Sequence, residues 1–218
     1  MKKLLTESDI ISFSGSGSKI FNVSKQTLLT PLAIDKAREL GITIVRNTAD
    51  ELIKGAPEAK SFDKGKKTIC IGGDHTGYQI KNILKEILKQ KSYEVFDVGT
   101  LSEQSCDYPD YAFEVAKKVA LKEYRFGILI DATGIPSAIT ANKVPGIRAA
   151  TCYNEFSAKS AREHNNANIL VVGAKSLGEE TIKSILDTWL QTEFGGERHQ
   201  RRLDKINAIE EKFVKSRS

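Results

Sequence analysis

From residue 67 onward the chain alternates short apolar runs with longer amphipathic segments, and this alternation restricts the fold more than any other feature. The runs GILI (127–130) and ILVV (169–172) are continuously apolar, which is typical of strands buried on both faces. The segment YQIKNILKEILKQK (78–91) instead carries its apolar residues at helical spacing. Five strands separated by helices predict a mostly parallel sheet with helices on both faces.

The same patterns predict the order of the elements in this part of the chain. The expected strands and helices alternate as follows: strands over 68–72, 93–99, 126–130, 147–153 and 167–173, and helices over 78–91, 108–122, 136–144, 154–164 and 178–194, with a further helix in the tail. Asn154 is the expected N-cap of the fourth helix. The predicted architecture is therefore a three-layer α/β/α sandwich with a five-stranded parallel sheet.

The first 66 residues follow a different pattern and predict a separate piece. The stretch 50–66 is rich in charge, Gly and Pro and has little to bury, so we interpret it as a linker. It divides a small N-terminal α+β extension (1–49) from a body that spans 67–218. About 40 residues make a weak core alone, so the extension is expected to dock on something.

Within the extension, the strand candidates KIFNV (19–23) and ITIVRN (42–47) flank a helix candidate. Thr30 is its expected N-cap, Pro31 occupies the first helical position and Gly41 is the stop signal. The stretch SGSGS (14–18) is expected to be flexible.

Composition narrows the class of protein. No apolar run approaches the roughly 20 residues of a membrane span, and Glu7 and Asp9 interrupt the apolar N-terminus, which makes a poor secretory signal. Cys70, Cys106 and Cys152 are an odd number without metal-ligand spacing, so we expect free thiols in the cytosol.

The net charge of +5 raises the question whether the chain binds nucleic acid. The arginines of the tail cluster in one short piece, GGERHQRR (195–202), without interleaved aromatic residues. That arrangement favours a compact anion site over a nucleic-acid surface, and a solvated helix face is the alternative.

Polar side chains follow two of the predicted strands directly. Ligands of open α/β sheets bind outside the carboxyl ends of the strands, which makes Asp131 a site candidate by position alone. Asp74 and His75 follow the first strand of the body and suit gripping hydroxyls or moving protons. Thr133 and Gly134 lie in a strand-to-helix turn, where backbone N–H groups either hold an anion or simply form a tight turn.

Two nucleotide-binding patterns are absent from the sequence. GGDHTG (72–77) places Asp74 where the dinucleotide pattern G-x-G-x-x-G needs its middle glycine, and no phosphate-loop lysine follows. All three histidines, His75, His164 and His199, lie in polar, turn-like segments, which favours roles in a site.

Together, several motifs resemble ribose-5-phosphate isomerase type B and the related galactose-6-phosphate isomerases. They are GGDHTGYQIK, DVGT, DYPDYA, ILIDATGI, ANKVPGIRAA, AREHNNANILVVGA and GGERHQRR, in the order and spacing of that family, across about residues 67–212. The resemblance implies a Rossmann-like α/β/α fold that works as a homodimer or dimer of dimers, with sites shared between subunits. It also implies cofactor-independent aldose–ketose interconversion of a sugar phosphate, without metal, through a cis-enediolate.

The resemblance also implies roles for individual residues. Asp74 and His75 would contact sugar hydroxyls or phosphate, and Thr133 with Gly134 would support ring opening and the enediolate. His164, assisting ring opening, would come from the partner subunit. The remaining implied substrate-binding residues are Asn165, also from the partner, and the phosphate-binding pair Arg198 and Arg202, whose guanidinium groups match phosphate geometry.

The sequence departs from the family pattern at the position of the catalytic base. Many members have CGTGIGMS, with the cysteine as base, and this chain has DATGIPSA (131–138). Asp131 takes the cysteine position, and Pro136 takes a glycine position without an N–H to offer. Other relatives place a glutamate further along this loop, where this chain has Ser137.

Two hypotheses follow from this departure. In the first, which we favour, Asp131 is the base and the chain is an isomerase. In the second, the chain has lost turnover and acts as a sugar-phosphate-binding or partner subunit. The LTPLA…ARELGI portion of the extension weakly resembles segments of enzymes of bacterial microcompartments, which suggests docking to a shell or partner enzyme. The alternative is that the extension packs on its own subunit or extends the dimer.

Overall fold

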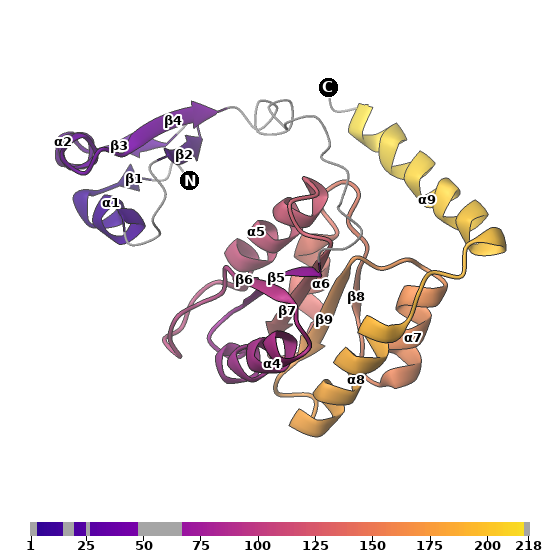
Figure 1. Ribbon diagram of the computed structural model, residues 1–218. Coiled ribbons are helices and arrows are strands. Elements are labelled where there is room, and N and C mark those ends of the chain that lie inside the picture. The colour runs from indigo at the N-terminus through magenta and orange to yellow at the C-terminus, as the bar shows by residue number, and fades with distance from the viewer. Residues whose placement is uncertain (1–3, 15–19, 25–26, 48–66, 216–218) are drawn as a thin grey trace. The chain divides into compact units, whose positions relative to one another are not determined.

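The computed structural model describes residues 4–14, 20–24, 27–47 and 67–215 (Figure 1). The chain divides into two compact units, residues 1–58 and 59–218. The boundary falls inside the predicted linker (50–66), which itself lies outside the described residues. Each unit is described by itself below.

The larger unit is built on one five-stranded sheet in the order β6-β5-β7-β9-β8. Every neighbouring pair of strands in it is parallel. The strands are β5 (Thr68–Gly73), β6 (Glu94–Asp97), β7 (Phe126–Asp131), β8 (Ala149–Thr151) and β9 (Ile169–Gly173). This confirms the predicted five-stranded parallel sheet, and the placement of β6 and β7 on either side of β5 makes β5–β7 a topological switch point.

Helices cover both faces of this sheet, as predicted (Figure 1). They are α4 (Tyr78–Gln90), α5 (Tyr108–Ala120), α6 (Ile135–Ala141), α7 (Glu155–Glu163), α8 (Glu179–Gln191) and α9 (Glu197–Lys215). The Asn154 side chain accepts from Ser157 N at 2.8 Å, which confirms the predicted cap of α7.

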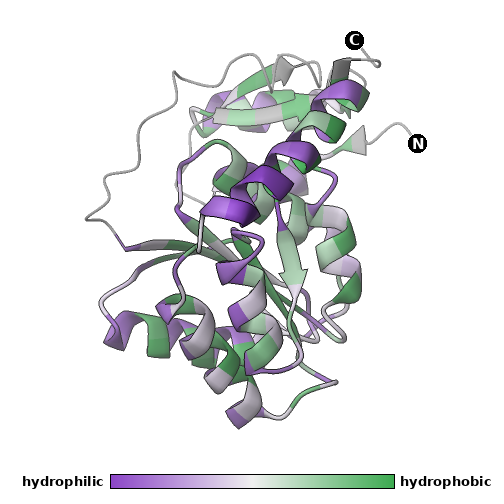
Figure 2. Ribbon diagram, turned by 90° about the vertical axis from the view of Figure 1, so that its right-hand side faces the viewer, coloured by the Kyte–Doolittle hydropathy of each residue, from purple (hydrophilic) through white to green (hydrophobic). Residues whose placement is uncertain are grey.

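Alternation along the strands divides the core into two layers. Ile128 and Ile130 of β7 pack with residues of α4, α7 and α8, while Leu129 between them packs with residues of α5 and α6. Successive side chains of a strand point to opposite faces, so a strand with apolar residues at every position serves both layers. Figure 2 shows this as strands in largely hydrophobic colours between helices of mixed colour.

The described residues of the smaller unit form two two-stranded parallel sheets and two helices. Its elements are β1 (Leu4–Leu5), α1 (Glu7–Ser14), β2 (Ile20–Ser24), β3 (Leu28–Leu29), α2 (Pro31–Glu39) and β4 (Thr43–Asn47). Thr30 Oγ1 accepts from Ala33 N at 3.2 Å, and Gly41 has a φ of 64°, so both predicted ends of α2 are confirmed. The sequence did not predict α1, and most of the stretch 14–18 lies outside the described residues.

A buried lysine ties α4 to the end of β6. Lys81 is fully buried, and its Nζ donates to both carboxylate oxygens of Asp97, at 2.9 and 2.8 Å, and to Thr100 O at 2.7 Å. Asp97 also accepts from Lys85 Nζ at 2.7 Å and from Gly99 N at 2.9 Å. This network holds the loop after β6 against the carboxyl edge of the sheet.

Among the residues that the structure describes, no helix combines the length and the apolar character that crossing a membrane requires.

We expect Lys81→Met to lower the free energy of unfolding of the larger unit by about 3 kcal/mol, because it leaves part of the buried Asp97 charge unpaired. Urea unfolding followed by the fluorescence of Trp189, the only tryptophan in the chain, measures it. The control is Lys85→Met, whose side chain is more exposed and should cost about 1 kcal/mol or less. Equal losses for the two variants would contradict this account of the network.

Candidate active site

The loops after β5 and β7 meet at the switch point of the sheet. Asp74 N donates to Ile130 O at 3.3 Å, which joins the start of the loop after β5 to the end of β7. The Asp74 side chain is buried, and its Oδ1 accepts from Thr76 N at 2.9 Å, Thr76 Oγ1 at 2.6 Å and Gly77 N at 3.3 Å. Asp74 therefore shapes the turn that leads into α4, and this occupies one of its two carboxylate oxygens.

Asp131 is the last residue of β7, and its side chain is turned under the loop that follows. It is 1% exposed. Its Oδ1 accepts from Thr133 N at 2.8 Å and Gly134 N at 2.6 Å, and its Oδ2 accepts from Ser137 N at 3.0 Å. The loop does present the converging N–H groups that the sequence predicted, but they are not free, because a carboxylate of the same chain accepts from them.

Close packing fixes the conformation of this loop. Gly134 has a φ of 79°, and a Cβ built there would lie 2.8 Å from Thr151 Cγ2, so only glycine fits. Ala174 N donates to Asp131 O at 2.8 Å, and Lys175 N donates to Ala132 O at 2.9 Å. These bonds bring the loop after β9, with the exposed Lys175 that the sequence analysis missed, beside the Asp131 loop.

His75 lies at the same edge, beside a thiol that the sequence analysis did not place in the site. Its Nδ1 accepts from Cys106 N at 3.3 Å and lies 3.9 Å from Cys106 Sγ. Burial raises the pKa of Tyr111, and a hydrogen bond with Cys106 raises it further. The position of Cys106 directly before the DYPDYA motif was the signal that could have drawn attention to it.

A second cluster forms where the end of α7 meets the start of α9. The rings of His164 and His199 stack with centroids 4.4 Å apart, and Arg198 Nε donates to His199 Nε2 at 3.3 Å. Burial lowers the pKa of His199, and the positive charges of His164, Arg198 and Arg202 lower it further. The exposed side chains of Arg198 and Arg202 are thus close to both histidines, and His199, a site candidate in the sequence without a specific role, belongs to the cluster.

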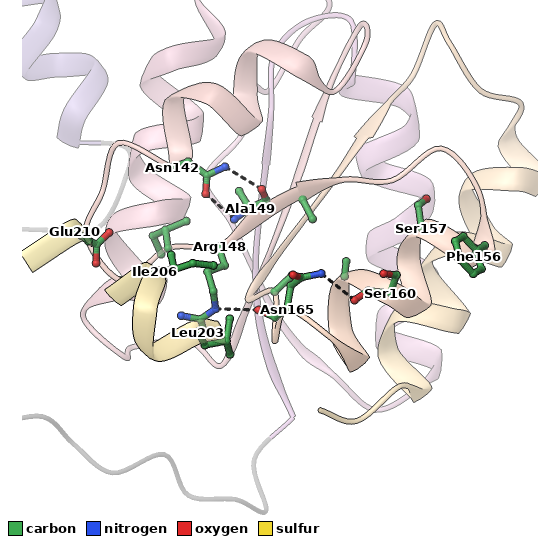
Figure 3. A pocket seen from close by; sticks show the side chains of 14 residues that line it. Asn142, Arg148, Ala149, Phe156, Ser157, Ser160, Asn165, Leu203, Ile206 and Glu210 are labelled. Carbon is green, nitrogen blue, oxygen red and sulfur yellow. Dashed lines mark hydrogen bonds between the residues drawn. The ribbon is translucent and has the colours of Figure 1, made fainter. Parts of the chain in front are cut away.

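Asn165 follows His164 and is held by its own helix. Its Nδ2 donates to Ser160 O at 3.1 Å. It is also the one predicted site residue that lines a cavity of about 650 Å³ between β8, α7 and α9 (Figure 3). Asp131 and its loop do not line that cavity.

The two clusters lie at opposite edges of the sheet. Asp131 pairs with Gly173 at the carboxyl ends of β7 and β9, whereas His164 and Asn165 precede the start of β9, which pairs with Gly127. Four residue steps of about 3.3 Å, or about 13 Å of strand, separate these two edges. One copy of the chain does not bring all the predicted site residues together.

Within the described parts of the chain, no group of three or more His, Cys, Asp and Glu side chains is arranged to hold a metal ion.

Comparison with known proteins shows that the larger unit is similar to proteins of a single family. Residues 69–206 match the family model described as Ribose/Galactose Isomerase. Ribose-5-phosphate isomerase B of Escherichia coli is 43% identical over 146 residues, 67% of this chain and 98% of that protein.

Two solved structures are similar over the same region. That of Clostridium thermocellum ribose-5-phosphate isomerase B has a TM-score of 0.66 and 48% identity, covering 67% of this chain and 99% of the other. The structure of the Mycoplasma genitalium enzyme with bound ribulose-5-phosphate has a TM-score of 0.64 and 42% identity, covering 66% and 96%.

Iodoacetamide should label Cys106 in the native protein and leave Cys70 and Cys152 unmodified. Cys106 is half-buried beside His75, whereas the other two are fully buried, and burial raises the pKa of Cys70 to about 12 and that of Cys152 to about 11. Peptide mass spectrometry after a timed reaction measures the labelling. Labelling of Cys70 or Cys152 as fast as Cys106 would contradict the geometry described.

Proposed function

The chain belongs to the ribose/galactose isomerase family, and from this premise we propose that it interconverts an aldose phosphate and a ketose phosphate. Ribose 5-phosphate and ribulose 5-phosphate are the first pair to test, because relatives carry that activity or that ligand in their names. The observation that carries the proposal is the junction at the switch point, where the backbone of Asp74 binds that of Ile130. It supports the proposal because it brings Asp74, at the start of the loop after β5, next to the strand that ends at Asp131.

In the proposed reaction a base removes the proton from C2 of the open-chain aldose to give a cis-enediolate. A proton then passes from O2 to O1, and protonation of C1 gives the ketose. The reaction needs a base, donors for the developing oxyanion and a grip on the phosphate, so no cofactor or metal is included. Asp74 and His75 are proposed to bind hydroxyls or phosphate, and Thr133 with Gly134 to face the enediolate. Lys175 adds a cation at the same edge of the sheet.

Asp131 is proposed as the base, as the sequence suggested. Its position at the end of β7 supports this role. Because the carboxylate is buried, its hydrogen bonds must change before it can act on a sugar. Because its oxygens accept from Thr133, Gly134 and Ser137, the carboxylate must release part of these N–H groups when a sugar binds. The same movement would free backbone donors for the enediolate oxygen.

The complete site is proposed to form between two copies of the chain. His164, Asn165, Arg198 and Arg202 lie at the opposite edge from Asp131, so a second copy has to supply them. In a two-fold dimer each copy would give one edge to each of two identical sites. A homodimer or a dimer of dimers satisfies this requirement.

A second function, sugar-phosphate binding without turnover, is favoured by one observation. The Asp131 carboxylate is 1% exposed and already holds three N–H groups, an arrangement suited to fixing a loop. In that case the arginines would still bind the phosphate ester. Calorimetry with ribose 5-phosphate, showing heat of binding without ketose formation, would identify this function.

The smaller unit is proposed to dock on a partner, in the cytoplasm or within a bacterial microcompartment. Ile11, Leu28 and Leu32 expose half or more of their surface. So much exposed apolar surface is unusual for a unit with so small a core. A shell protein, a partner enzyme and the larger unit of a second copy are the candidate surfaces.

Asp131→Asn should lower kcat for ribose 5-phosphate by about 100-fold or more, because an amide cannot accept the substrate proton. Ketose formation measures this, and circular dichroism checks that the variant folds. Asp35→Asn, an exposed aspartate of the smaller unit, is the matched control and should leave kcat unchanged. Unimpaired turnover by Asp131→Asn would rule out Asp131 as the base.

Mixing two separately inactive variants, His75→Gln and Arg198→Gln, should restore activity if sites are shared between copies. Random pairing in a two-fold dimer leaves one intact site in each mixed pair, about a quarter of wild-type activity. The assay is ketose formation after the subunits have exchanged. If each mixture stays as inactive as its components although exchange is complete, the shared site is wrong.

A further inference from the structure

A second cavity, of about 480 Å³, opens at the amino edge of the sheet and is predominantly basic. It is bordered by the end of α5, the start of β7, the segment before β8, the end of α7 and the segment after α8. The charged residues that line it are Lys122, Arg125, Arg148 and Arg162 against the single carboxylate of Glu193. Arg198 and Arg202 do not line it.

Arg162 is the most unusual of these side chains, because it is 4% exposed and carries a full charge. Its Nη1 donates to Ala167 O at 2.6 Å and to Asn166 Oδ1 at 3.1 Å. Its Nε is buried and has no hydrogen-bond partner among the described residues. A buried cation is costly without a counter-charge, and no carboxylate described here comes within ion-pair distance of it.

Neighbouring guanidinium groups increase this excess of positive charge. Burial lowers the pKa of Arg162 to about 10, and Arg125 and Arg148 lower it while only Glu193 opposes them. Burial also lowers the pKa of Arg148, and the charge of Glu210 opposes that shift. Arg125 approaches Glu193 at 3.9 Å, a weak pairing in which the carboxylate is mostly exposed. The cavity is therefore lined by three guanidinium groups, and Glu193 is the only carboxylate among the described residues that line it.

We propose that this cavity is a binding site for a small phosphorylated anion, separate from the sugar site. Its volume lies in the range of about 300–1,000 Å³ typical of small-molecule sites. Guanidinium groups bind phosphate through paired N–H donors, and such an anion supplies the counter-charge that Arg162 lacks.

The cavity is in direct contact with the segment that carries two predicted site residues. Arg148 Nε donates to Asn165 O at 3.1 Å, drawn in Figure 3, and to Asn166 O at 3.0 Å. An anion that draws Arg148 toward Arg162 would change the hydrogen bonds from Arg148 to the carbonyl groups of Asn165 and Asn166. This change would alter the position of Asn165 and of His164 next to it. The site is therefore placed to adjust the α7 end of the sugar site.

Trp189 provides a direct reporter of occupancy. The Arg162 guanidinium lies over its ring, with Cζ 5.1 Å from the ring, and it is the only tryptophan of the chain. Titration of the full chain with inorganic pyrophosphate at constant ionic strength should give a saturable change in its emission. Arg148→Gln and Arg125→Gln should each raise the dissociation constant by about tenfold or more, since each removes one charged phosphate contact.

Two matched variants separate this site from other anion binding. Arg38→Gln, in the smaller unit, and Arg198→Gln, in the α9 cluster, should both leave the pyrophosphate titration unchanged. The proposal is overturned if emission shows no saturable change or if Arg148→Gln and Arg125→Gln, folded by circular dichroism, bind as the wild type does. It is equally overturned if Arg198→Gln abolishes the signal, because the anion would then occupy the sugar site.

Discussion

The carboxylate of Asp131 determines what the rest of the candidate site can do. It closes the loop after β7 by accepting from Thr133 N, Gly134 N and Ser137 N while remaining 1% exposed. Backbone N–H groups at a strand-to-helix turn need an acceptor, and here the acceptor belongs to the chain itself. An oxyanion of a substrate would need the same donors, so binding and catalysis both depend on whether this carboxylate gives them up.

The parallel sheet imposes a second condition on the site. Its carboxyl edge carries Asp74, His75 and Asp131, and its amino edge carries the histidine and arginine cluster of α7 and α9. The two edges of one sheet cannot come together within a single copy of the chain. The proposed isomerase site therefore requires a second copy of the chain, and the basic cavity beside Arg162 lies at the edge that one copy would contribute to the site of the other.

The sequence predicted the elements of the larger unit well, because buried parallel strands are apolar at every position and their helices are amphipathic. It also placed Asp131 at a strand end and Asn154 at a cap. It could not predict the contacts of Asp131, since both a free and a bound carboxylate suit that position. The cavity of Arg125, Arg148 and Arg162 was missed because only the fold joins these residues, and α1 was missed because its eight residues carry a weak helical pattern.

The proposed activity requires proton transfer between neighbouring carbons of a sugar phosphate by a group that exchanges its proton with solvent. Conversion of ribose 5-phosphate in deuterium oxide, followed by proton and deuterium NMR, tests this directly. We expect ribulose 5-phosphate with deuterium at C1, because an exchanged base delivers solvent deuterium to the enediolate. A ketose product without deuterium, or no ketose under conditions where the sugar binds, would contradict it.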